Sequence, residues 1–357
     1  MANPPHTRTR ILVARLDRLG DVLMTLPSLA FLRQAFPTAE IDFACRTEWH
    51  ALLRPFLAQH EIQALAPATE GSQWLARLKA RGYRGSLLLH PPNSLVLACW
   101  RAAIPVRVRG SSKVFSAIFS NTGQRQKRSY AAKNEAEYNL ELARALSSKL
   151  GGKQVAYVPP IQVGSDGASV QTAHEILNAL GVEVAKPYIV IHPGMGQSAL
   201  NLDARSYSAL IQILRKLTGY PILLSVGPTH YDQAFSETIL AKERHLHVLE
   251  GLALPVLREV FRTSFLVVAP STGPLHLAHL VGAKTLGVYS PIRSQRKDRW
   301  APWGGTGESH ILVPEVSCPA TRKCLGAKCE FYPCLDRQFD EQLRSQTEGV
   351  LRKVIEG

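Results

Sequence analysis

The sequence has no uninterrupted apolar run of the roughly 18 residues that a membrane-spanning helix requires. The longest candidate is broken by His90, Pro91, Pro92, Asn93 and Arg101. The segment Met1 to Arg10 also lacks the apolar stretch of a secretory signal. We therefore expect a cytoplasmic protein that is not integral to a membrane, with peripheral contact to a membrane surface left open.

Several motifs of nucleotide and nucleic-acid chemistry are absent as well. The chain has neither a Gly-x-Gly-x-x-Gly dinucleotide fingerprint nor a Walker lysine loop, which argues against dehydrogenase and ATPase chemistry. It also lacks zinc-finger spacing and the aromatic-studded basic strands of nucleic-acid modules. No tandem repeat of fixed period occurs.

Acidic residues are scarce relative to basic ones. The chain carries 28 Asp and Glu against 42 Lys and Arg, a formal net charge of +14. Such an excess suggests an anionic partner, such as nucleic acid, anionic lipid or a phosphorylated substrate. A concentrated basic group lies in the first half of the chain: Arg101, Arg107, Arg109, Lys113, Arg125, Lys127, Arg128 and Lys133. This group is either an interaction surface or a solvated loop face.

Only six cysteines occur, and their surroundings differ. Cys45 and Cys99 lie in apolar stretches and are expected to be reduced core residues. The others share one short basic segment: Cys318, Cys324, Cys329 and Cys334. Their intervals differ from the close Cys-x-x-Cys pairs of common zinc sites. Two interpretations remain, a tetrahedral metal site or a loop without an ion.

Strand-like apolar runs alternate with helical patterns in both halves of the 357 residues. The main predicted strands are Ile11 to Arg15, Ile41 to Cys45, Leu87 to His90, Val106 to Arg109, Tyr188 to His192, Pro221 to Val226, His247 to Leu249, Phe265 to Ala269 and Thr285 to Tyr289. Helical spacing is clearest in Glu135 to Leu150 and Tyr207 to Leu217. This alternation predicts parallel sheets with right-handed crossovers, an α/β fold.

The N-terminal stretch from Ile11 to Pro27 is the most informative segment. An apolar run ends in Arg15 and Asp17, a turn is permitted at Gly20, and Asp21 stands where a helix should begin. Ligands of open α/β sheets bind at the carboxyl ends of strands, so Asp21 is a candidate catalytic carboxylate. It is also a candidate helix N-cap, which is the more common role of Asp at such a position.

In the second half, small residues follow predicted strands in three places. Ser271-Thr-Gly-Pro-Leu-His276 precedes a helical stretch, and exposed N–H groups at a helix start form a phosphate cradle. His276 either hydrogen-bonds a phosphate or sugar there or is a buried capping histidine. Similar turns carry Gly194 and Gly196 after one strand and Gly227 after another. Together they predict one crevice lined with backbone donors.

These segments resemble glycosyltransferase family 9, the ADP-heptose:lipopolysaccharide heptosyltransferases. The resemblance rests on Arg15-Leu-Asp-Arg-Leu-Gly-Asp-Val-Leu, on His192-Pro-Gly, on Ser271-Thr-Gly-Pro-Leu-His276, on Ser290-Pro and on Arg299-Trp-Ala-Pro-Trp-Gly. The motifs occur in the right order over nearly the whole chain. The resemblance implies a GT-B fold, with two Rossmann-like, doubly wound parallel-sheet domains facing a central cleft.

The expected domains follow from this resemblance and from a Gly- and Pro-rich boundary near residues 151–167. Residues 1–168 would form an acceptor-binding domain and residues 169–186 a linker with a bridging helix. Residues 187–339 would form a nucleotide-sugar-binding domain, followed by a C-terminal helix over 340–357.

The resemblance also implies roles for individual residues. Asp21 would be the general base of an inverting transfer. The donor-binding set would be Ser271, Thr272, Gly273, Pro274, His276, Gly194, Gly196, Leu252 and Asp232, with Leu252 at the adenine and Asp232 at the ribose. The acceptor and phosphate-binding set would be Arg15, Arg18, Lys113, Arg128, Arg293 and Arg296.

Three positions depart from the family pattern. Leu200 stands where the family usually has a lysine, Ser271 where it has an aspartate, and Ile292-Arg293 where a Thr-Asp pair is common. The lost lysine removes a phosphate counter-charge, which Arg293, Arg296 or Lys297 can replace. The identity of the donor sugar therefore stays open.

The expected function is transfer of heptose or a related sugar from an ADP-sugar to a lipopolysaccharide core or lipid A acceptor at the anionic inner membrane. No cofactor is required for catalysis, a structural metal at the cysteines is left open, and no specific nucleic acid is expected. Two alternatives remain. One is a protein O-heptosyltransferase, and the other is a non-catalytic protein that binds sugar nucleotides or nucleic acid.

Overall fold

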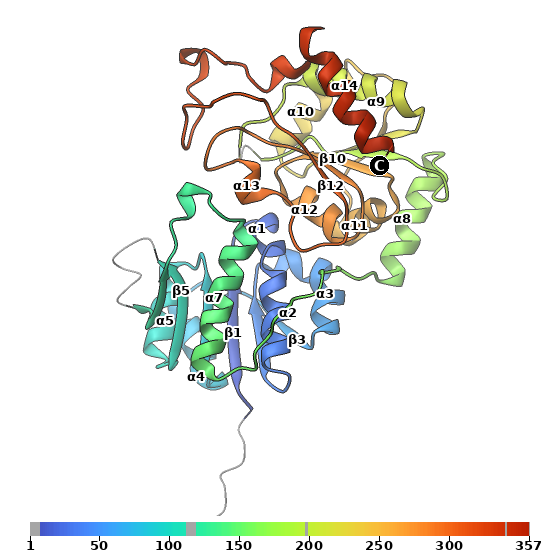
Figure 1. Cartoon of the computed structure of the whole chain (residues 1–357). Coiled ribbons are helices and arrows are strands. Elements are labelled where there is room, and N and C mark those ends of the chain that lie inside the picture. Colours follow the sequence, from blue (N-terminus) through green and yellow to red (C-terminus); the bar gives the residue numbers. More distant parts are fainter. Residues whose placement is uncertain (1–7, 112–118, 197–198, 340, 357) are drawn as a thin grey trace, which may run out of the picture. The chain divides into compact units, whose positions relative to one another are not determined.

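The computed structural model describes residues 8–111, 119–196, 199–339 and 341–356. The chain divides into two compact units (Figure 1). Unit 1 contains residues 1–128 and 135–163, and unit 2 contains residues 129–134 and 164–357. Each unit has one six-stranded sheet, and the strand pairs are parallel in both. The two-sheet α/β fold predicted from the sequence is therefore confirmed.

The sheet of unit 1 has the strand order β3-β2-β1-β4-β5-β6. Its strands are β1 (Arg10–Arg15), β2 (Glu40–Ala44), β3 (Ile62–Leu65), β4 (Gly85–Leu89), β5 (Val106–Ser111) and β6 (Thr122–Arg125). The central strands β1 and β4 are buried almost throughout. Their continuous apolar runs are typical of parallel strands covered by helices on both faces.

Helices cover both faces of this sheet. They are α1 (Leu19–Leu23), α2 (Leu26–Ala35), α3 (His50–Gln59), α4 (Gly71–Arg81), α5 (Asn93–Arg101) and α7 (Glu135–Leu150), with the 3₁₀ turns η1 (Thr47–Trp49) and η2 (Arg128–Tyr130). Helices α2 and α7 lie side by side (Figure 1). On the other face, α4 and α5 bury Trp74 and Leu95 against Leu12 and Ala14 of β1. Side chains that alternate along β1 therefore enter two separate cores.

The sheet of unit 2 has the order β12-β11-β10-β7-β8-β9. Its strands are β7 (Ile189–Ile191), β8 (Ile222–Ser225), β9 (His247–Leu249), β10 (Leu266–Pro270), β11 (Thr285–Val288) and β12 (Ser309–Leu312). The two sheets share one strand order. The first strand of each unit (β1 or β7) lies between the second (β2 or β8) and the fourth (β4 or β10).

The helices of unit 2 also form two layers. They are α8 (Gly167–Ala179), α9 (Ala204–Thr218), α10 (His230–Leu240), α11 (Leu254–Thr263), α12 (Gly273–Leu280), α13 (Lys297–Trp300) and α14 (Glu341–Glu356), with η3 (Gly326–Lys328) and η4 (Asp336–Phe339). Leu210 of α9 and Leu351 of α14 share one core with Ile191 and Val268 of the sheet. None of the helices in the described part of the chain is both long enough and apolar enough to cross a bilayer.

The strand order creates one topological switch point in each sheet. It lies between β1 and β4 in unit 1 and between β7 and β10 in unit 2, because the connections leave these neighbouring strands in opposite directions. At a switch point the loops beyond the carboxyl ends diverge and leave room for a ligand. In unit 1 the segment with Asp21 follows β1, and in unit 2 the turns at His192 and Ser271 follow β7 and β10.

Candidate functional site

Asp21 lies just beyond the carboxyl end of β1, in the short helix α1. This helix begins at Leu19, and Arg18 occupies the N-cap position. The expectation that Asp21 begins the helix and caps it is therefore wrong, because the helix starts two residues earlier. Asp21 lies in the first turn instead, where a negative charge is still favoured by the partial positive charge of the helix start.

The guanidinium of Arg15 forms ion pairs with three carboxylates. Its Nη2 is paired with Asp21, its Nε lies 2.7 Å from Oδ1 of Asp17, and its Nη1 lies 3.5 Å from Oε1 of Glu135. The Arg15 side chain is only 4% exposed. A guanidinium with its charge divided among three carboxylates positions those groups. Arg15 is thus a buried partner of Asp21, and its guanidinium does not lie on a surface that is open to phosphate.

The Asp21 carboxyl is shielded from water but keeps one accessible side. Its side chain is 17% exposed. Burial raises the pKa of Asp21 to about 6, and the charges of Asp17 and Glu135 add to the rise, while the positive charge of Arg15 opposes it. A carboxylate with this pKa is ionised at neutral pH and is a better proton acceptor than an ordinary aspartate.

Glu135 is the first residue of α7 and is the third carboxylate that contacts Arg15. It is 2% exposed and is paired with Nη1 of Arg128, which also donates to Oδ1 of Asn139 over 3.2 Å. Asn139 in turn donates to the carbonyl of Met24, at the end of α1, over 3.2 Å. Arg128, predicted as a phosphate ligand, therefore pairs with the two α7 residues that support the Asp21 site.

No sequence motif marks Glu135 or Asn139 as site residues. They are separated from Arg15 by more than a hundred positions, since the Arg15–Glu135 pair spans 120 residues. His90, at the carboxyl end of β4, was also missed, although it is close enough for its charge to lower the pKa of Asp21. Its φ of 52° lies in the left-handed region, which is uncommon for a residue other than glycine.

In unit 2, Asp232 holds the glycine-rich turn that follows β7. Its Oδ1 accepts hydrogen bonds from the N–H groups of Met195 (3.0 Å) and Gly196 (3.1 Å), and its Oδ2 accepts one from Thr229 Oγ1 (2.6 Å). A Cβ atom added at Gly194 would lie 2.9 Å from Asp232 Oδ1. The turn therefore needs glycine because the Asp232 side chain packs directly against its backbone. Asp232, predicted at the ribose, is 4% exposed.

His192 lies at the start of the same turn. Its Nδ1 is 3.1 Å from Ser225 Oγ, at the end of β8, and burial lowers the pKa of His192 to about 4. The imidazole is thus neutral at physiological pH and serves as a hydrogen-bonding spacer between two strand ends.

The second donor-side turn leads from β10 into α12. Ser271, Thr272, Gly273 and Pro274 are half-buried, and Thr272 occupies the N-cap position with extended backbone geometry. The first N–H groups of a helix have no intrahelical acceptor and so face an anion readily. His192 N donates to the carbonyl of Val268 on β10 over 2.8 Å, so the two turns emerge from adjacent strands.

His276 lies one turn into α12 and is 4% exposed. Burial, with a contribution from His279, lowers the pKa of His276 to about 3, so it is a neutral donor or acceptor. His279 itself accepts a hydrogen bond at Nε2 from the N–H of Gly305 over 3.1 Å. His279, which no sequence motif marks, thereby holds the loop after the Trp-Ala-Pro-Trp motif.

The other predicted residues lie in more open places. Leu252 is half-buried in the loop before α11, and Arg18 and Arg293 are exposed. Arg296 Nε lies 3.7 Å from Oδ2 of Asp298. Lys113 lies outside the described residues.

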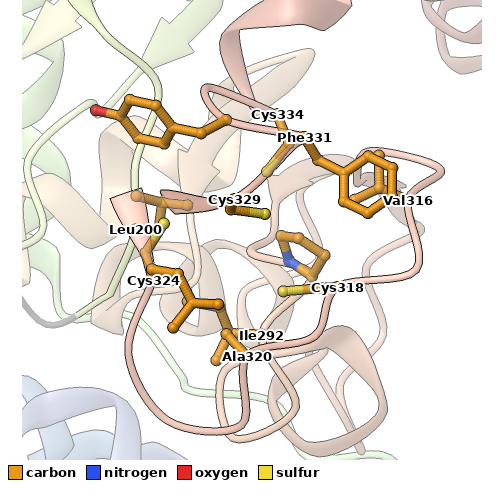
Figure 2. A pocket seen from close by; sticks show the side chains of 12 residues that line it. Leu200, Ile292, Val316, Cys318, Ala320, Cys324, Cys329, Phe331 and Cys334 are labelled. Atoms are coloured by element: carbon orange, nitrogen blue, oxygen red, sulfur yellow. The ribbon is translucent and has the colours of Figure 1, made fainter. Parts of the chain in front are cut away.

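The four clustered cysteines line one small pocket of unit 2, which we call the cysteine pocket. Its thiols belong to Cys318, Cys324, Cys329 and Cys334. Leu200 and Ile292, both at positions that depart from the family pattern, line the same pocket (Figure 2). The departures therefore share one apolar environment with the cysteines.

Comparisons with known proteins agree with this geometry. The family model of glycosyltransferase family 9 (heptosyltransferase) matches residues 76–325. A Haemophilus influenzae protein named as a putative glycosyltransferase is 27% identical over 318 residues, covering 88% of this chain and 90% of that protein.

Two solved structures share the fold over almost their whole length. The family 9 glycosyltransferase of Veillonella parvula has a TM-score of 0.77 at 18% identity, covering 98% of this chain and 100% of that chain. The ADP-heptose lipopolysaccharide heptosyltransferase II of Escherichia coli has a TM-score of 0.71 at 17% identity, covering 97% and 98%. The protein is thus a glycosyltransferase with a GT-B fold. It belongs to glycosyltransferase family 9, the heptosyltransferase family.

Proposed function

We propose that the protein transfers heptose, or a related sugar, from an ADP-sugar to a hydroxyl of a lipopolysaccharide core acceptor, with inversion at the anomeric carbon. The observation that carries the proposal is the Asp21 carboxylate, held by buried Arg15 at the switch point of the first sheet. A binding protein has no need of a carboxylate with a pKa near neutrality at that position.

In the proposed reaction Asp21 acts as general base. The acceptor hydroxyl gives its proton to Asp21 while its oxygen forms a bond to the anomeric carbon. The bond from that carbon to the diphosphate oxygen breaks, and ADP leaves with the electron pair. The acceptor hydroxyl becomes acidic as its oxygen bonds to the anomeric carbon, and its proton is transferred at that stage. A pKa of about 6 at Asp21 therefore suits the step at neutral pH.

The donor diphosphate is proposed to lie on the turn from Ser271 to Pro274. The N–H groups at the start of α12 would stabilise the charge that grows on the leaving ADP. Arg293 and Arg296 are the proposed replacements for the missing family lysine at Leu200. Structures of an E. coli heptosyltransferase with ADP and with a fluorinated ADP-heptose have the same fold, with TM-scores of 0.65 and 0.59 at 17% identity, which supports an ADP-sugar as the donor class.

The positive charge suggests where the acceptor is met. A net charge of +14 favours phosphorylated lipid acceptors and an anionic membrane surface. We propose that the protein works at the inner membrane by peripheral contact, with exposed Arg18 near the acceptor. No metal ion is invoked in the transfer step.

Isothermal titration with ADP, UDP and GDP at two salt concentrations tests the donor assignment. We expect ADP to bind at least tenfold more tightly than UDP or GDP, and the preference to persist at high salt because base recognition is not ionic. Equal binding of the three nucleotides, or loss of all binding at high salt, would contradict an adenine-specific site. An acceptor screen that includes protein hydroxyls then separates lipid from protein glycosylation.

A change at Glu135 tests the electrostatics of the base. Glu135→Gln removes a negative charge that raises the pKa of Asp21. Asp21 accepts a proton only when it is ionised, so the transfer rate of the native protein should rise with pH through about 6. In the variant this acid limb should move to lower pH, which a pH profile of the transfer rate measures.

The matched control is Glu40→Gln. Glu40 lies at the amino end of β2, where it pairs with Arg10 at 2.7 Å, and Glu40 is not among the groups that shift Asp21. Its acid limb should stay in place. If the acid limb of the pH profile shifts in both variants, or in neither, Glu135 does not control the pKa of Asp21.

A further inference from the structure

Arg109 places a positive charge on an apolar face of the first sheet. It is the last residue of β5 that pairs with β4, where it lies beside Leu88. Residues that are neighbours in register point to the same face of a sheet, and Leu88 belongs to the core that also contains Trp74 of α4 and Leu95 of α5. Apolar side chains are the usual occupants of strand positions under a helical layer, so the guanidinium at this position calls for a physical reason.

Two nitrogens of the Arg109 guanidinium have no acceptor among the residues that the structure describes. Its Nε and Nη1 are shielded from water, and neither of them donates a hydrogen bond. Burial lowers the pKa of Arg109, and no described carboxylate offsets that effect, yet arginine stays protonated in proteins. A shielded charge without a partner is costly, which indicates that its partner is a ligand.

The other arginines of this unit show how the fold satisfies a guanidinium. Arg15 forms ion pairs with three carboxylates. Arg107 lies two positions before Arg109 on the same strand. It donates from Nε to the carbonyl of Phe119 over 3.0 Å and from Nη1 to the carbonyl of Ile104 over 2.6 Å. The fold therefore uses these two guanidinium groups itself, whereas the Nε and Nη1 donors of Arg109 are kept for another acceptor.

An anion can approach the guanidinium of Arg109 from one side. The residue as a whole is half-buried, and Nη2 is not among its water-shielded nitrogens. Nη2 shares an edge of the planar guanidinium with each of the other two nitrogens. A phosphate or carboxylate would bond to Nη2 and to one of its neighbours, in the two-bond geometry that arginine forms with these groups.

Arg109 and Asp21 lie at the same edge of the sheet. The strands at this point are in the order β1-β4-β5. The last residue pairs along them are Arg15 with Leu89 and Leu88 with Arg109, so both strands approach their carboxyl ends together. Two strand spacings amount to about 10 Å. An anion on Arg109 would thus lie within the span of a short oligosaccharide from the Asp21 segment.

We propose that Arg109 binds a phosphate or carboxylate group of the acceptor, and so selects acceptors that carry an anionic group near the hydroxyl that receives the sugar. The identity of the molecule that carries the anion rests on the proposed function, whereas the anion site itself does not depend on it. An uncharged protein segment offers no such group, so the site favours an anionic glycan over a protein hydroxyl.

Anion binding by the native protein is the first test, because it needs neither donor nor acceptor. NMR follows the side-chain Nε–H signal of Arg109, which is assigned by its loss in Arg109→Met. Inorganic phosphate or acetate is added, with sodium chloride at equal ionic strength as the reference. We expect a saturable shift with at least one of the two oxyanions and none with chloride, and the stronger of the two names the acceptor's anionic group. A signal that moves with neither oxyanion, or equally with chloride, would overturn the proposal.

Stability separates an anion site from a structural role. Arg109→Met replaces an unpaired charge by an apolar side chain, so it should raise the unfolding temperature by a few degrees in the absence of oxyanions. The matched control is Arg101→Met, which removes the same charge from an exposed position on α5 and should leave the unfolding temperature nearly unchanged. If Arg109→Met instead lowers the unfolding temperature, Arg109 supports the fold and the proposal fails.

Kinetics connect the site to the transfer reaction. Arg109→Met should raise KM for an anionic acceptor by about tenfold or more, the effect of one lost charge-assisted contact. Its kcat and its affinity for ADP should stay close to the native values, and Arg101→Met should keep the native KM. An unchanged KM in Arg109→Met would contradict the role in acceptor selection. If the native protein transfers sugar to none of the acceptors tested, the proposed function fails instead, and the NMR titration still decides whether Arg109 binds an anion.

Discussion

Asp21→Asn should reduce sugar transfer by about 10²–10⁴-fold while leaving the affinity for ADP nearly unchanged. The range is the usual contribution of a general base. Asparagine keeps the shape of the side chain and its contact with Arg15 through the amide oxygen, but it cannot accept the hydroxyl proton. Initial rates with saturating donor and acceptor measure the loss, and titration calorimetry measures the affinity for ADP.

The same substitution should not destabilise the fold at neutral pH. Burial raises the pKa of Asp21 from 3.8 to about 6, so the folded state holds its proton more tightly than the unfolded state. Ionised Asp21 therefore costs stability, a cost that is absent below about pH 4 and complete above about pH 6. The Asn variant removes this cost, on the order of 1–3 kcal/mol. We expect a higher unfolding temperature for it at pH 8 and no gain at pH 4.

Asp17→Asn is the matched control for catalysis. Asp17 binds the same guanidinium at 2.7 Å but its side chain is 27% exposed, and it has no place in the proposed proton transfer. It should retain most of the activity at pH 8. If both variants lose activity to a similar extent, the carboxylates serve only to balance Arg15, and the base must be sought elsewhere.

The sequence predicted the central strands of each sheet better than most of the edge strands. Strands β1, β7 and β10 were expected close to their observed bounds, because parallel strands buried on both faces are continuous apolar runs. The edge strands β3, β6 and β12 were missed, whereas the edge strand β9 was predicted with its observed bounds, His247–Leu249. Only Ile62 in β3 and Leu312 in β12 are buried, so their sequences lack the apolar pattern that identifies a strand.

The site shows the same limit. A carboxylate after β1 and small residues after β10 were visible as local patterns of strand, turn and helix. The partners Glu135 and Asn139 were not, because the apolar stripe of α7 predicts its buried face but not which strand end its first turn meets. Arg15 was expected to bind phosphate, and only the fold reveals three carboxylates around it.

Asp232→Ala should weaken ADP binding by tenfold or more and destabilise unit 2. The substitution leaves the N–H groups of Met195 and Gly196 without the oxygen that accepts both of them. A buried N–H without an acceptor costs about 1–3 kcal/mol. Met195 is buried whereas Gly196 is exposed to water, so we expect a total loss of about 1–3 kcal/mol. Denaturant titration gives the stability, and calorimetry with ADP gives the affinity.

Two further variants separate support of the turn from direct contact with the ligand. Asp203→Ala removes the N-cap of α9, whose Oδ1 accepts from Ser206 N over 2.7 Å. It should lower the free energy of unfolding by about 1 kcal/mol with little effect on the affinity for ADP.

Asp232→Asn keeps an oxygen for the two N–H groups, so its ADP affinity should stay closer to that of the native protein than to that of the Ala variant. If Asp232 instead contacts the ribose as a carboxylate, the Asn variant will lose as much affinity as the Ala variant while its stability is largely retained. The turn after β7 belongs to the donor site only if Asp232→Ala weakens ADP binding much more than Asp203→Ala does, because both variants lose a carboxylate at the start of a helix in the same unit.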